Sequence, residues 1–575
     1  MIRVADYIMK FLVDKGVEDI FLLTGNGAMY LNDGIASQPS IKYYCARNEA
    51  ASPMMAEAYA RLKQSLGAVC LTSGPGSTNA IPGLAEAYVD AAPILILSGQ
   101  APRNHTTHNM GISGLRSFGT AEIDIIPIVS SLTKYAVMVN DPSSIRYHLE
   151  KAVYLATSGR PGPVWLDIPM DVQFALINPD ELVGFNPSLL LSIKNPLASN
   201  LEKDIDLVLK MMSQSRKPLI VAGYGIRQGN AINEFKKFLT LFNAPVVLSR
   251  LGIDILSFSH PNNMGLAGIK GTRYCKKIMR SADLIICLGS RLAVPFVGHN
   301  LDAFSADAKR IVVDIEPAEL KKSGIGIDLP INADVKTVID RLITKLSFGP
   351  LNFKPWLNYC QNLKESYPML TEDMKKNPIN LYYFMSKLDA VSDARNVLIT
   401  DAGSNYYVGG QVFRFEKGQR ELTSGTFAAM GLTIPLAIGA SIAKKDAQIL
   451  AVTGDGSLEL NIQELKTISY YRLNIKLFVI NNGGYVSMRN WQDNVFDGRR
   501  IGSDNETGAE SLNLAKIADA FDLNYVAITC QEEIDEKLKT VMSDDQPVFI
   551  EVFCDNNQKI VEPLDHDKID IEPEV

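Results

Sequence analysis

Short apolar runs that alternate with stretches of helical periodicity are the feature that most restricts the fold of this chain. In the first block, strand-like runs lie at residues 20–23, 41–45, 68–71, 94–97 and 164–166. Strands that alternate with helices favour a mostly parallel sheet, because parallel neighbours need a crossover connection. The pattern recurs twice along the chain. The sequence therefore predicts an α/β fold with three doubly wound parallel-sheet domains.

The second and third blocks are set apart by stretches without this pattern. A polar stretch at 186–200 is typical of a linker, and a looser segment lies at 350–378. Strand-like runs follow at 219–222, 246–248, 284–288 and 311–313, and again at 397–400, 449–452, 476–480 and 548–553. We predict domains at 1–180, 195–347 and 370–555, and a C-terminal tail at 556–575 whose acidic end is solvated.

Charge and apolar patterning exclude several classes of partner. The chain has 57 basic and 64 acidic side chains, a formal net charge of -7, which argues against binding to a nucleic acid. No run of about 18 apolar residues predicts a membrane span, and no secretion signal is visible. The seven cysteines lack a Cys-x-x-Cys pair and indicate core thiols. We expect a cytoplasmic protein that binds neither nucleic acid nor a membrane.

A glycine-rich turn with one carboxylate follows the predicted strand at 449–452. Gly454, Asp455 and Gly456 come at its carboxyl end, and Ser457 and a helical segment follow them. Ligands of parallel sheets bind at this edge. Glycines let backbone N–H groups approach phosphate oxygens, and a helix N-terminus favours negative charge. The turn predicts an anion site, although Asp-Gly alone also occurs in ordinary turns.

An asparagine pair ends the next predicted strand. Asn481 and Asn482 come after 24 intervening residues, so both strand ends should reach the same sheet edge. Magnesium and calcium take carboxylate, amide and carbonyl oxygens as ligands. Asp455 and one amide of the asparagine pair are therefore candidate metal ligands.

Gly-Asp-Gly followed by Asn-Asn at this spacing resembles the motif that defines thiamine-diphosphate enzymes. The resemblance implies thiamine diphosphate and Mg²⁺ as cofactors, with Asp455, Asn482 and the carbonyl of Gly484 as metal ligands. The cofactor-binding residues that it implies are Thr24, Gly25, Gly76, Asn79, Gly403, Ser404, Asn405, Met430, Gly454, Gly456, Ser457, Gly484, Tyr485 and Val486.

A glutamate apart from the metal is also required, because a carboxylate bonded to the aminopyrimidine of thiamine promotes loss of its C2 proton. Glu49 follows the predicted strand at 41–45 and opens a helix, a position that resembles the activating glutamate of these enzymes. The alternative is a first-turn acid stabilised by the helix dipole. The Ser-Gly-Pro-Gly-Ser-Thr-Asn block at 73–79 also resembles the pyrimidine-side domain of the superfamily and favours a catalytic role.

Nearly the whole chain resembles the acetolactate synthase group, which has pyrimidine, central and diphosphate domains in this order. The stretches at 158–164 and 430–439 match it as well. By this likeness Met430 is a second catalytic residue that imposes a bent cofactor shape, and the alternative is a core methionine. In that group the activating glutamate of one subunit reaches the diphosphate domain of another. The resemblance therefore implies a homodimer or homotetramer.

The central block is similar to the flavin-binding domain of acetolactate synthases. Candidate FAD residues at strand ends, where a dinucleotide binds, are Gly223, Gly225, Gly289, Ser290, Arg291, Asp314 and Ile315. The glycine fingerprint is incomplete, and residues 292–295 lack the arginines that often follow the Gly-x-Arg element. We expect FAD in a structural rather than a redox role, with a domain that holds no flavin as the alternative.

The implied reaction is decarboxylation of a 2-oxo acid, with pyruvate expected, and transfer of the acyl carbanion to an acceptor carbonyl. Candidate acceptor-pocket residues are Phe118, Met488 and Trp491, and the alternative for Trp491 is a buried aromatic. Asn48 replaces a common histidine, and residues 115–125 and 483–485 also depart from acetolactate synthases. These departures favour a ketone or keto-sugar acceptor. Acetolactate synthase, a hydrolase or lyase of a cyclic diketone or acyl-CoA, and a binding protein without turnover remain alternatives.

Overall fold

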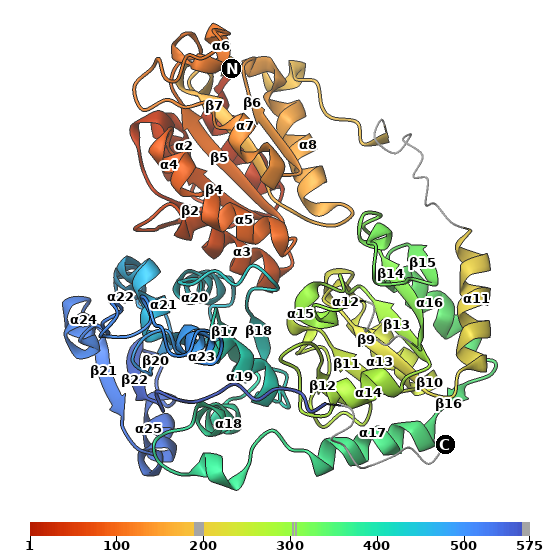
Figure 1. Cartoon of the computed structure of the whole chain (residues 1–575). Coiled ribbons are helices and arrows are strands. Elements are labelled where there is room, and N and C mark those ends of the chain that lie inside the picture. Colours follow the sequence, from red (N-terminus) through yellow and green to blue (C-terminus); the bar gives the residue numbers. More distant parts are fainter. Residues whose placement is uncertain (189–199, 302–303, 305–306, 566–575) are drawn as a thin grey trace.

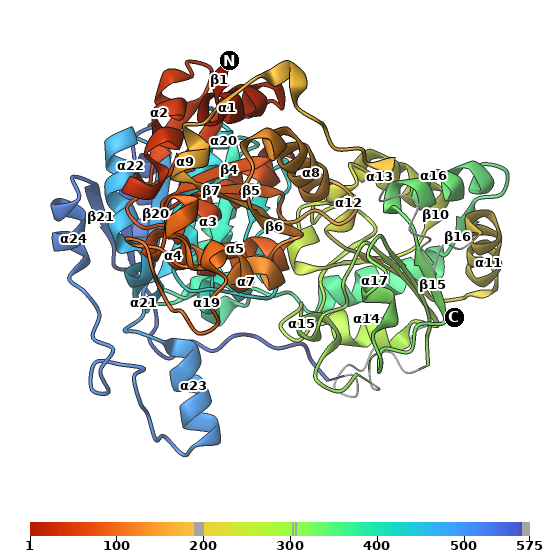
Figure 2. The same cartoon turned by 90° about the horizontal axis from the view of Figure 1, so that it is seen from above.

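Three six-stranded sheets form the framework of the computed structural model (Figures 1 and 2). The structure describes residues 1–188, 200–301, 304 and 307–565. Most of the predicted linker and the acidic end of the predicted tail lie outside the described residues. Every strand pair within the three sheets is parallel, which confirms the predicted α/β class with three parallel-sheet domains.

The N-terminal domain has the strand order β3-β2-β4-β5-β7-β6. Its strands are β2 (Asp19–Leu22), β3 (Lys42–Cys45), β4 (Gly67–Leu71), β5 (Ile94–Gln100), β6 (Tyr135–Met138) and β7 (Val164–Pro169). Its longer helices are α1 (Val4–Asp14), α2 (Met29–Ser37), α3 (Ala51–Lys63), α5 (Ile81–Val89) and α8 (Ile145–Thr157). Strands β4 and β5 are buried along their whole length, as expected for central strands covered on both faces.

The central domain has the order β12-β11-β9-β13-β14-β15. Its strands are β9 (Pro218–Ala222), β11 (Val246–Leu248), β12 (Asn263–Leu266), β13 (Leu284–Leu288), β14 (Lys309–Asp314) and β15 (Leu329–Asn332). Its longer helices are α11 (Leu201–Gln214), α13 (Ile232–Leu241), α14 (Cys275–Ser281), α16 (Val335–Leu346) and α17 (Lys354–Ser366). Helix α17 lies in the segment that the sequence predicts to be loose. Its apolar side packs on the domain core, and the indole of Trp356 donates to the Pro218 carbonyl at 2.9 Å.

The C-terminal domain has the order β18-β17-β19-β20-β22-β21. Its strands are β17 (Asn396–Thr400), β18 (Arg420–Leu422), β19 (Gln448–Gly454), β20 (Ile475–Asn481), β21 (Asn524–Ile528) and β22 (Val548–Phe553). Its longer helices are α18 (Leu381–Val391), α19 (Ser404–Val412), α20 (Thr433–Ala443), α22 (Leu465–Tyr471), α23 (Val486–Val495), α24 (Leu514–Ala520) and α25 (Ile534–Val541). Strands β19 and β20 are neighbours, so their carboxyl ends lie side by side.

Helices α3 and α20 join the N-terminal and C-terminal domains. A Cβ atom added to Gly439 on α20 would lie 2.1 Å from the Met55 carbonyl oxygen on α3, so a glycine is needed for this close approach. Both helices are almost entirely buried. The two domains therefore share one continuous apolar core.

Ion pairs and a C-terminal strap join the central and C-terminal domains. Asp254 pairs with Arg227 of its own domain at 2.7 Å and with Arg420 on β18 at 2.8 Å. Residues 555–565, the strap, run from the C-terminal domain to the central one (Figure 1). Leu564 N–H donates to the Arg273 carbonyl at 2.8 Å. This described part of the predicted tail is thus packed against the protein.

A search of the described residues found no helix that is long and apolar enough to cross a membrane.

Candidate functional site

Asp455 lies directly after β19, at the start of the short helix α21 (Asp455–Leu458), and is only 2% exposed. Its Oδ2 accepts hydrogen bonds from the Gly484 N–H at 2.9 Å and the Ser511 hydroxyl at 3.0 Å. Its Oδ1 accepts from the Gly456 N–H at 2.9 Å. Burial raises the pKa of Asp455, because a buried carboxylate loses hydration. The two ends of the predicted motif therefore meet in space.

Arg489 on α23 fixes the turn at 482–484 that follows β20. Its guanidinium donates to the carbonyl oxygens of Asn482 at 2.7 Å and Ser503 at 3.1 Å, and also to that of Gly483. Gly484 has a φ of +101°, a conformation that other residues rarely adopt. A glycine at 484 thus allows its own N–H to reach Asp455.

Magnesium fits the chemistry of this turn. Among the described residues, the buried Asp455 forms no ion pair, and the side chain of Asn482 makes no hydrogen bond. A buried carboxylate without a counter-ion is unfavourable. A divalent cation held by the Asp455 carboxylate, the Asn482 amide oxygen and the Gly484 carbonyl would supply the missing positive charge.

Asp401, which directly follows β17, organises the residues beside the metal turn and was not predicted from the sequence. Its Oδ2 accepts from the Ser457 hydroxyl at 2.5 Å and the Thr453 hydroxyl at 3.2 Å. Its Oδ1 accepts from the Asn405 amide at 3.0 Å. A signal was present, because an acid at the carboxyl end of a parallel strand is a candidate site residue, as Asp455 is.

The other predicted residues of the C-terminal domain gather around this network. A Cβ added to Gly456 would lie 2.3 Å from the Tyr485 ring, which packs directly on the glycine, and Val486 begins α23 next to it. Gly403 and Ser404 start α19, and Gly403 faces the Ser487 hydroxyl. Gly454 precedes Asp455 and is half-buried. The half-buried Met430 adjoins Gly431, whose N–H donates to the Ser457 hydroxyl at 2.8 Å.

A second group forms in the N-terminal domain around Glu49. The Asn79 amide donates to Glu49 Oε2 at 2.8 Å and to Asn48 Oδ1 at 2.9 Å. A Cβ added to Gly76 would lie 3.4 Å from Glu49 Oε1, so this oxygen faces the glycine. Glu49 Oε1 makes no hydrogen bond to the described residues and can accept one from a ligand.

Gly25 and Gly76 both lie against Thr72 and complete this second group. A Cβ added to Gly25 would come within 2.4 Å of Thr72, and one added to Gly76 within 2.6 Å. Thr24, which precedes Gly25, is exposed. Thr72, Glu49 and Asn79 therefore contribute polar side chains to this group.

Glu464 fixes the loop before Glu49 and was also missed. Its Oε1 accepts from the N–H groups of Arg47 and Asn48 at 2.8 and 2.9 Å, and its Oε2 accepts from the Thr467 hydroxyl at 2.7 Å. Glu464 is fully buried in the C-terminal domain. Within one chain this contact sets the position of the Glu49 loop. No hydrogen bond or ion pair of the described residues joins Glu49 itself to the Asp455 group.

A cavity of about 1230 Å³ opens where the three domains meet. Its lining includes Gly225, Gly289, Ser290, Arg291, Asp314 and Ile315 from the predicted FAD set, but not Gly223. Trp491 on α23 lines the same cavity and is 58% exposed, so it is not a buried aromatic. Phe118 and Met488 are also exposed but do not line this cavity.

Family models match the chain in three segments. The N-terminal TPP binding domain of thiamine pyrophosphate enzymes matches residues 2–123, their central domain matches 205–342, and their C-terminal TPP binding domain matches 401–552. The fold and the two residue groups described above thus belong to a thiamine pyrophosphate-dependent enzyme.

Curated relatives specify the family within this class. The acetolactate synthase large subunit of Lactococcus lactis is 30% identical over 96% of this chain and 93% of its own length. The acetolactate synthase of Mycobacterium bovis is 30% identical over 92% of this chain and 84% of its own, and the chloroplastic enzyme of Arabidopsis thaliana is 29% identical over 97% and 82%. The chain belongs to the acetolactate synthase-like family.

Proposed function

We propose that this enzyme decarboxylates a 2-oxo acid, with pyruvate as the expected donor, and transfers the acyl unit to an acceptor carbonyl. The observation that carries the proposal is the pairing of Asp455 with the turn at 482–484, together with a separate carboxylate, Glu49, that keeps one oxygen free. When bound, thiamine diphosphate supplies the nucleophilic carbon and accepts the electrons released with carbon dioxide.

The residues of the chain hold and orient the cofactor in this proposal. Asp455, Asn482 and Gly484 would ligate Mg²⁺, and Gly456 and Ser457 would lie against the diphosphate near the start of α21. Glu49 would exchange a proton with the pyrimidine through Oε1, while Asn79 holds Oε2. Met430 would support the bent cofactor from the side of Gly431.

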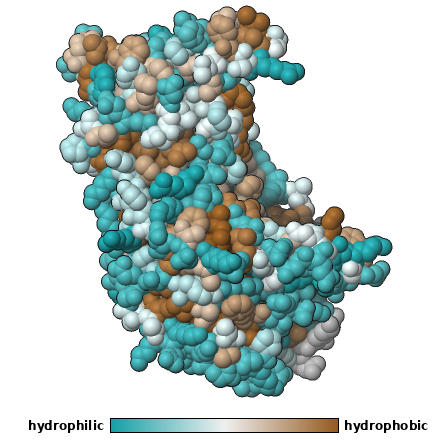
Figure 3. Space-filling model, turned by 90° about the vertical axis from the view of Figure 1, so that its left-hand side faces the viewer, coloured by the Kyte–Doolittle hydropathy of each residue, from teal (hydrophilic) through white to brown (hydrophobic). Residues whose placement is uncertain are grey.

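A homodimer or homotetramer is part of the same proposal. In Figure 2, helix α23 projects away from the body of the chain. Its Met488, Trp491 and Val495 are 49%, 58% and 50% exposed, and Phe496 after it is 43% exposed. Apolar patches also interrupt the side formed by the N-terminal and C-terminal domains (Figure 3). Such surfaces support a partner subunit, which would bring a second Glu49 to the Asp455 group.

Two classes of acceptor carbonyl are compatible with this reaction. The similarity to acetolactate synthases favours a second 2-oxo acid as the acceptor. Asn48, Tyr485 and the segment at 115–125 favour a ketone or keto sugar, which we propose as the acceptor. Trp491 would contact the acceptor, because its side chain is exposed on α23, which begins directly after the turn at 482–484 and Tyr485.

The test is an assay with Mg²⁺, thiamine diphosphate and a panel of 2-oxo acids, with and without a ketone. We expect carbon dioxide release from pyruvate and a new carbon–carbon bond to the ketone. Acetolactate as the dominant product in the presence of ketone would instead identify an acetolactate synthase. Absence of carbon dioxide from every 2-oxo acid would refute the proposed reaction. With Trp491→Ala, product formation should fall more than decarboxylation does.

We propose FAD as a structural occupant of the central cavity. Its volume of about 1230 Å³ exceeds the roughly 300–1,000 Å³ of ordinary ligand pockets, which suits a dinucleotide. Asp314 ends β14, where an acid can accept from ribose hydroxyls. Arg160, at the cavity wall, is already paired with Glu319 at 2.6 Å.

An absorbance spectrum of the purified protein tests the flavin proposal. We expect flavin bands that persist through gel filtration and do not bleach during turnover, because the flavin would have no redox role. A Gly289→Val variant should lose the bands, since Gly289 lines the cavity and packs against Gly225. A colourless wild-type preparation that stays empty after FAD is added would remove the flavin from this protein.

A further inference from the structure

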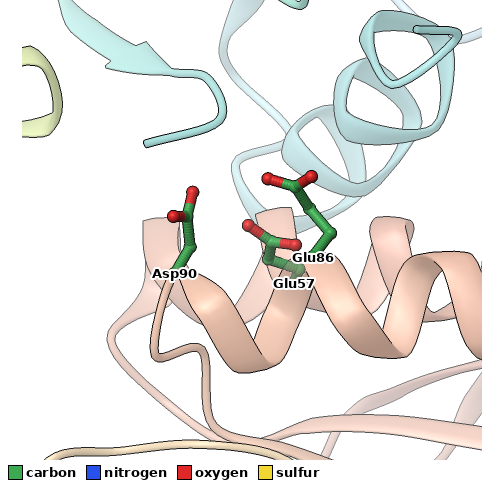
Figure 4. A group of neighbouring side chains, drawn as sticks. All are labelled: Glu57, Glu86 and Asp90. Atoms are coloured by element: carbon green, nitrogen blue, oxygen red, sulfur yellow. The ribbon is translucent and has the colours of Figure 1, made fainter. Parts of the chain in front are cut away.

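Met430 lies in a segment that is held on both sides of the methionine. On the side that precedes Met430, the N–H of Gly425 donates to Asp90 Oδ2 at 2.7 Å. Asp90 lies beside Glu57 and Glu86 in the N-terminal domain (Figure 4). This first anchor therefore fixes the segment relative to the N-terminal domain, and not relative to the residues that would hold the metal.

On the other side of Met430, the next residue is held by residues that follow β19. The N–H of Gly431 donates to the Ser457 hydroxyl at 2.8 Å, and its carbonyl accepts from the Asn461 amide at 2.9 Å. Gly431 has a φ of +78°, and a Cβ added to it would lie 2.7 Å from Leu460. A glycine is therefore needed here, and the backbone after Met430 lies directly against these residues.

The Ser457 hydroxyl is already used in both of its roles. A hydroxyl can donate one hydrogen bond, and Ser457 donates its own to Asp401 Oδ2 at 2.5 Å. The same oxygen accepts from the Gly431 N–H. The hydroxyl is thus not free to donate to a ligand while it holds Asp401, and it joins Gly431 to that carboxylate.

Asp401 is 0% exposed and fixes the direction of this hydroxyl. Its other partners are the Thr453 hydroxyl at 3.2 Å and the Asn405 amide at 3.0 Å. All three partners donate to the carboxylate, so the hydrogen of the Ser457 hydroxyl points to Asp401 and a lone pair remains for Gly431. Through these bonds Asp401 joins the end of β17 to α19, β19 and α21.

We propose that Asp401 is a positioning residue for Met430. It acts through the Ser457 hydroxyl, which holds the Gly431 N–H. This chain of hydrogen bonds fixes Met430 relative to the turn that contains Asp455, whereas the anchor in the N-terminal domain does not. Without it, Met430 would lose the position from which it supports a bent cofactor. The inference rests on the proposed role of Met430 at the cofactor.

The first test needs no cofactor. In Ser457→Ala the N–H of Gly431 loses its acceptor, and we expect this amide hydrogen to exchange with solvent about 10-fold faster. Hydrogen exchange of the cofactor-free protein, followed by mass spectrometry, measures the rate. Asp401→Asn should act in the same direction, because an amide has one acceptor oxygen where a carboxylate has two. It is the second variant if Ser457→Ala does not fold.

Two controls separate this effect from a general loosening of the domain. The N–H of Ala428 donates to the Ser424 hydroxyl on the other side of Met430, and should exchange as in the wild type. Ser441→Ala changes another buried serine of the same domain, on α20, and should leave the exchange of the 431 amide unaltered.

The second test measures the bound cofactor. With Mg²⁺ and thiamine diphosphate bound, Ser457→Ala should slow the exchange of the C2 proton with solvent by about 10- to 100-fold, because a small misplacement near the reacting atoms costs this much. Nuclear magnetic resonance after a rapid acid quench follows this exchange. The affinity for the cofactor, measured by calorimetric titration, should change far less, because the Asp455 group is intact.

A double variant shows whether the serine acts through the methionine. Met430→Ala should also slow the exchange of the C2 proton, and adding Ser457→Ala to it should have little further effect. A wild type that exchanges this proton rapidly but releases no carbon dioxide would refute only the proposed reaction. Amide exchange at Gly431 or C2 exchange that is unaltered in Ser457→Ala, or a full additional loss in the double variant, would overturn the role of Asp401.

Discussion

Asp455→Asn is expected to abolish tight binding of thiamine diphosphate with Mg²⁺. Asp455 is the only carboxylate of the proposed metal group, and the asparagine keeps its size but not its charge. Loss of a direct metal ligand should weaken cofactor affinity by about 100-fold or more, with a similar loss of activity. Calorimetric titration of the protein with Mg²⁺ and thiamine diphosphate measures the affinity.

Two comparisons make this result specific to the metal. Without cofactor, Asp455→Asn removes a buried charge that has no counter-ion, but its amide nitrogen cannot accept from the N–H of Gly484 or Gly456, so the melting temperature of the cofactor-free variant is the baseline for the comparison. The rise in melting temperature on adding cofactor should disappear. Asp522→Asn, a change at an exposed ion pair with Lys466, should bind cofactor normally. Cofactor affinity that is unaltered in Asp455→Asn would show that the diphosphate is anchored elsewhere.

Glu49→Gln is expected to leave cofactor binding nearly intact but to lower kcat by about 10²- to 10⁴-fold, the usual contribution of general acid–base catalysis. The glutamine oxygen can still accept from Asn79, so the local structure should persist. Carbon dioxide release at saturating cofactor measures the loss, and calorimetric titration checks the affinity. A variant that retained most of its activity would exclude Glu49 as the activating acid.

Co-assembly of Asp455→Asn subunits with Glu49→Gln subunits tests whether the active site is shared between subunits. If Glu49 of one subunit serves Asp455 of the other, a mixed dimer has one intact site and one doubly altered site. Random co-assembly of the two inactive variants should then restore about a quarter of the wild-type activity. If each chain forms its own complete site, the mixture should stay inactive.

The strands that the sequence predicts correctly are mostly interior ones. All four interior strands of each sheet were expected from continuous apolar runs, which arise because helices cover both faces of such strands. The missed strands of the three six-stranded sheets, which are β6, β12, β15, β18 and β21, all lie at sheet edges. Strand β21, for example, has only one fully buried residue. An edge strand needs fewer apolar side chains, so its pattern is weak.

The residues of the candidate site also fall into two groups, those that the sequence predicts and those that it does not. Asp455, Gly456 and Asn482 belong to a local motif whose spacing is fixed by one strand-helix-strand unit, so they could be predicted from the sequence. Asp401 and Glu464 act on residues 56 and more than 400 positions away. Asp401 has the signal of an acid at the carboxyl end of a strand, but no motif in the sequence indicates the distant partner of either acid. Only the fold brings them to Ser457 and to the loop of Glu49.

Helix α3 begins two residues after Glu49, and Glu57 and Arg61 lie further along it. Its 13 residues form a rod of about 20 Å. In the proposed dimer, the Glu49 end would serve the active site of the partner, while Arg61 donates to the carbonyl of Thr423, seven residues before Met430, in its own chain. A displacement at one active site would then be transmitted along α3 to the other. The two sites of such a dimer should bind cofactor and substrate cooperatively rather than independently.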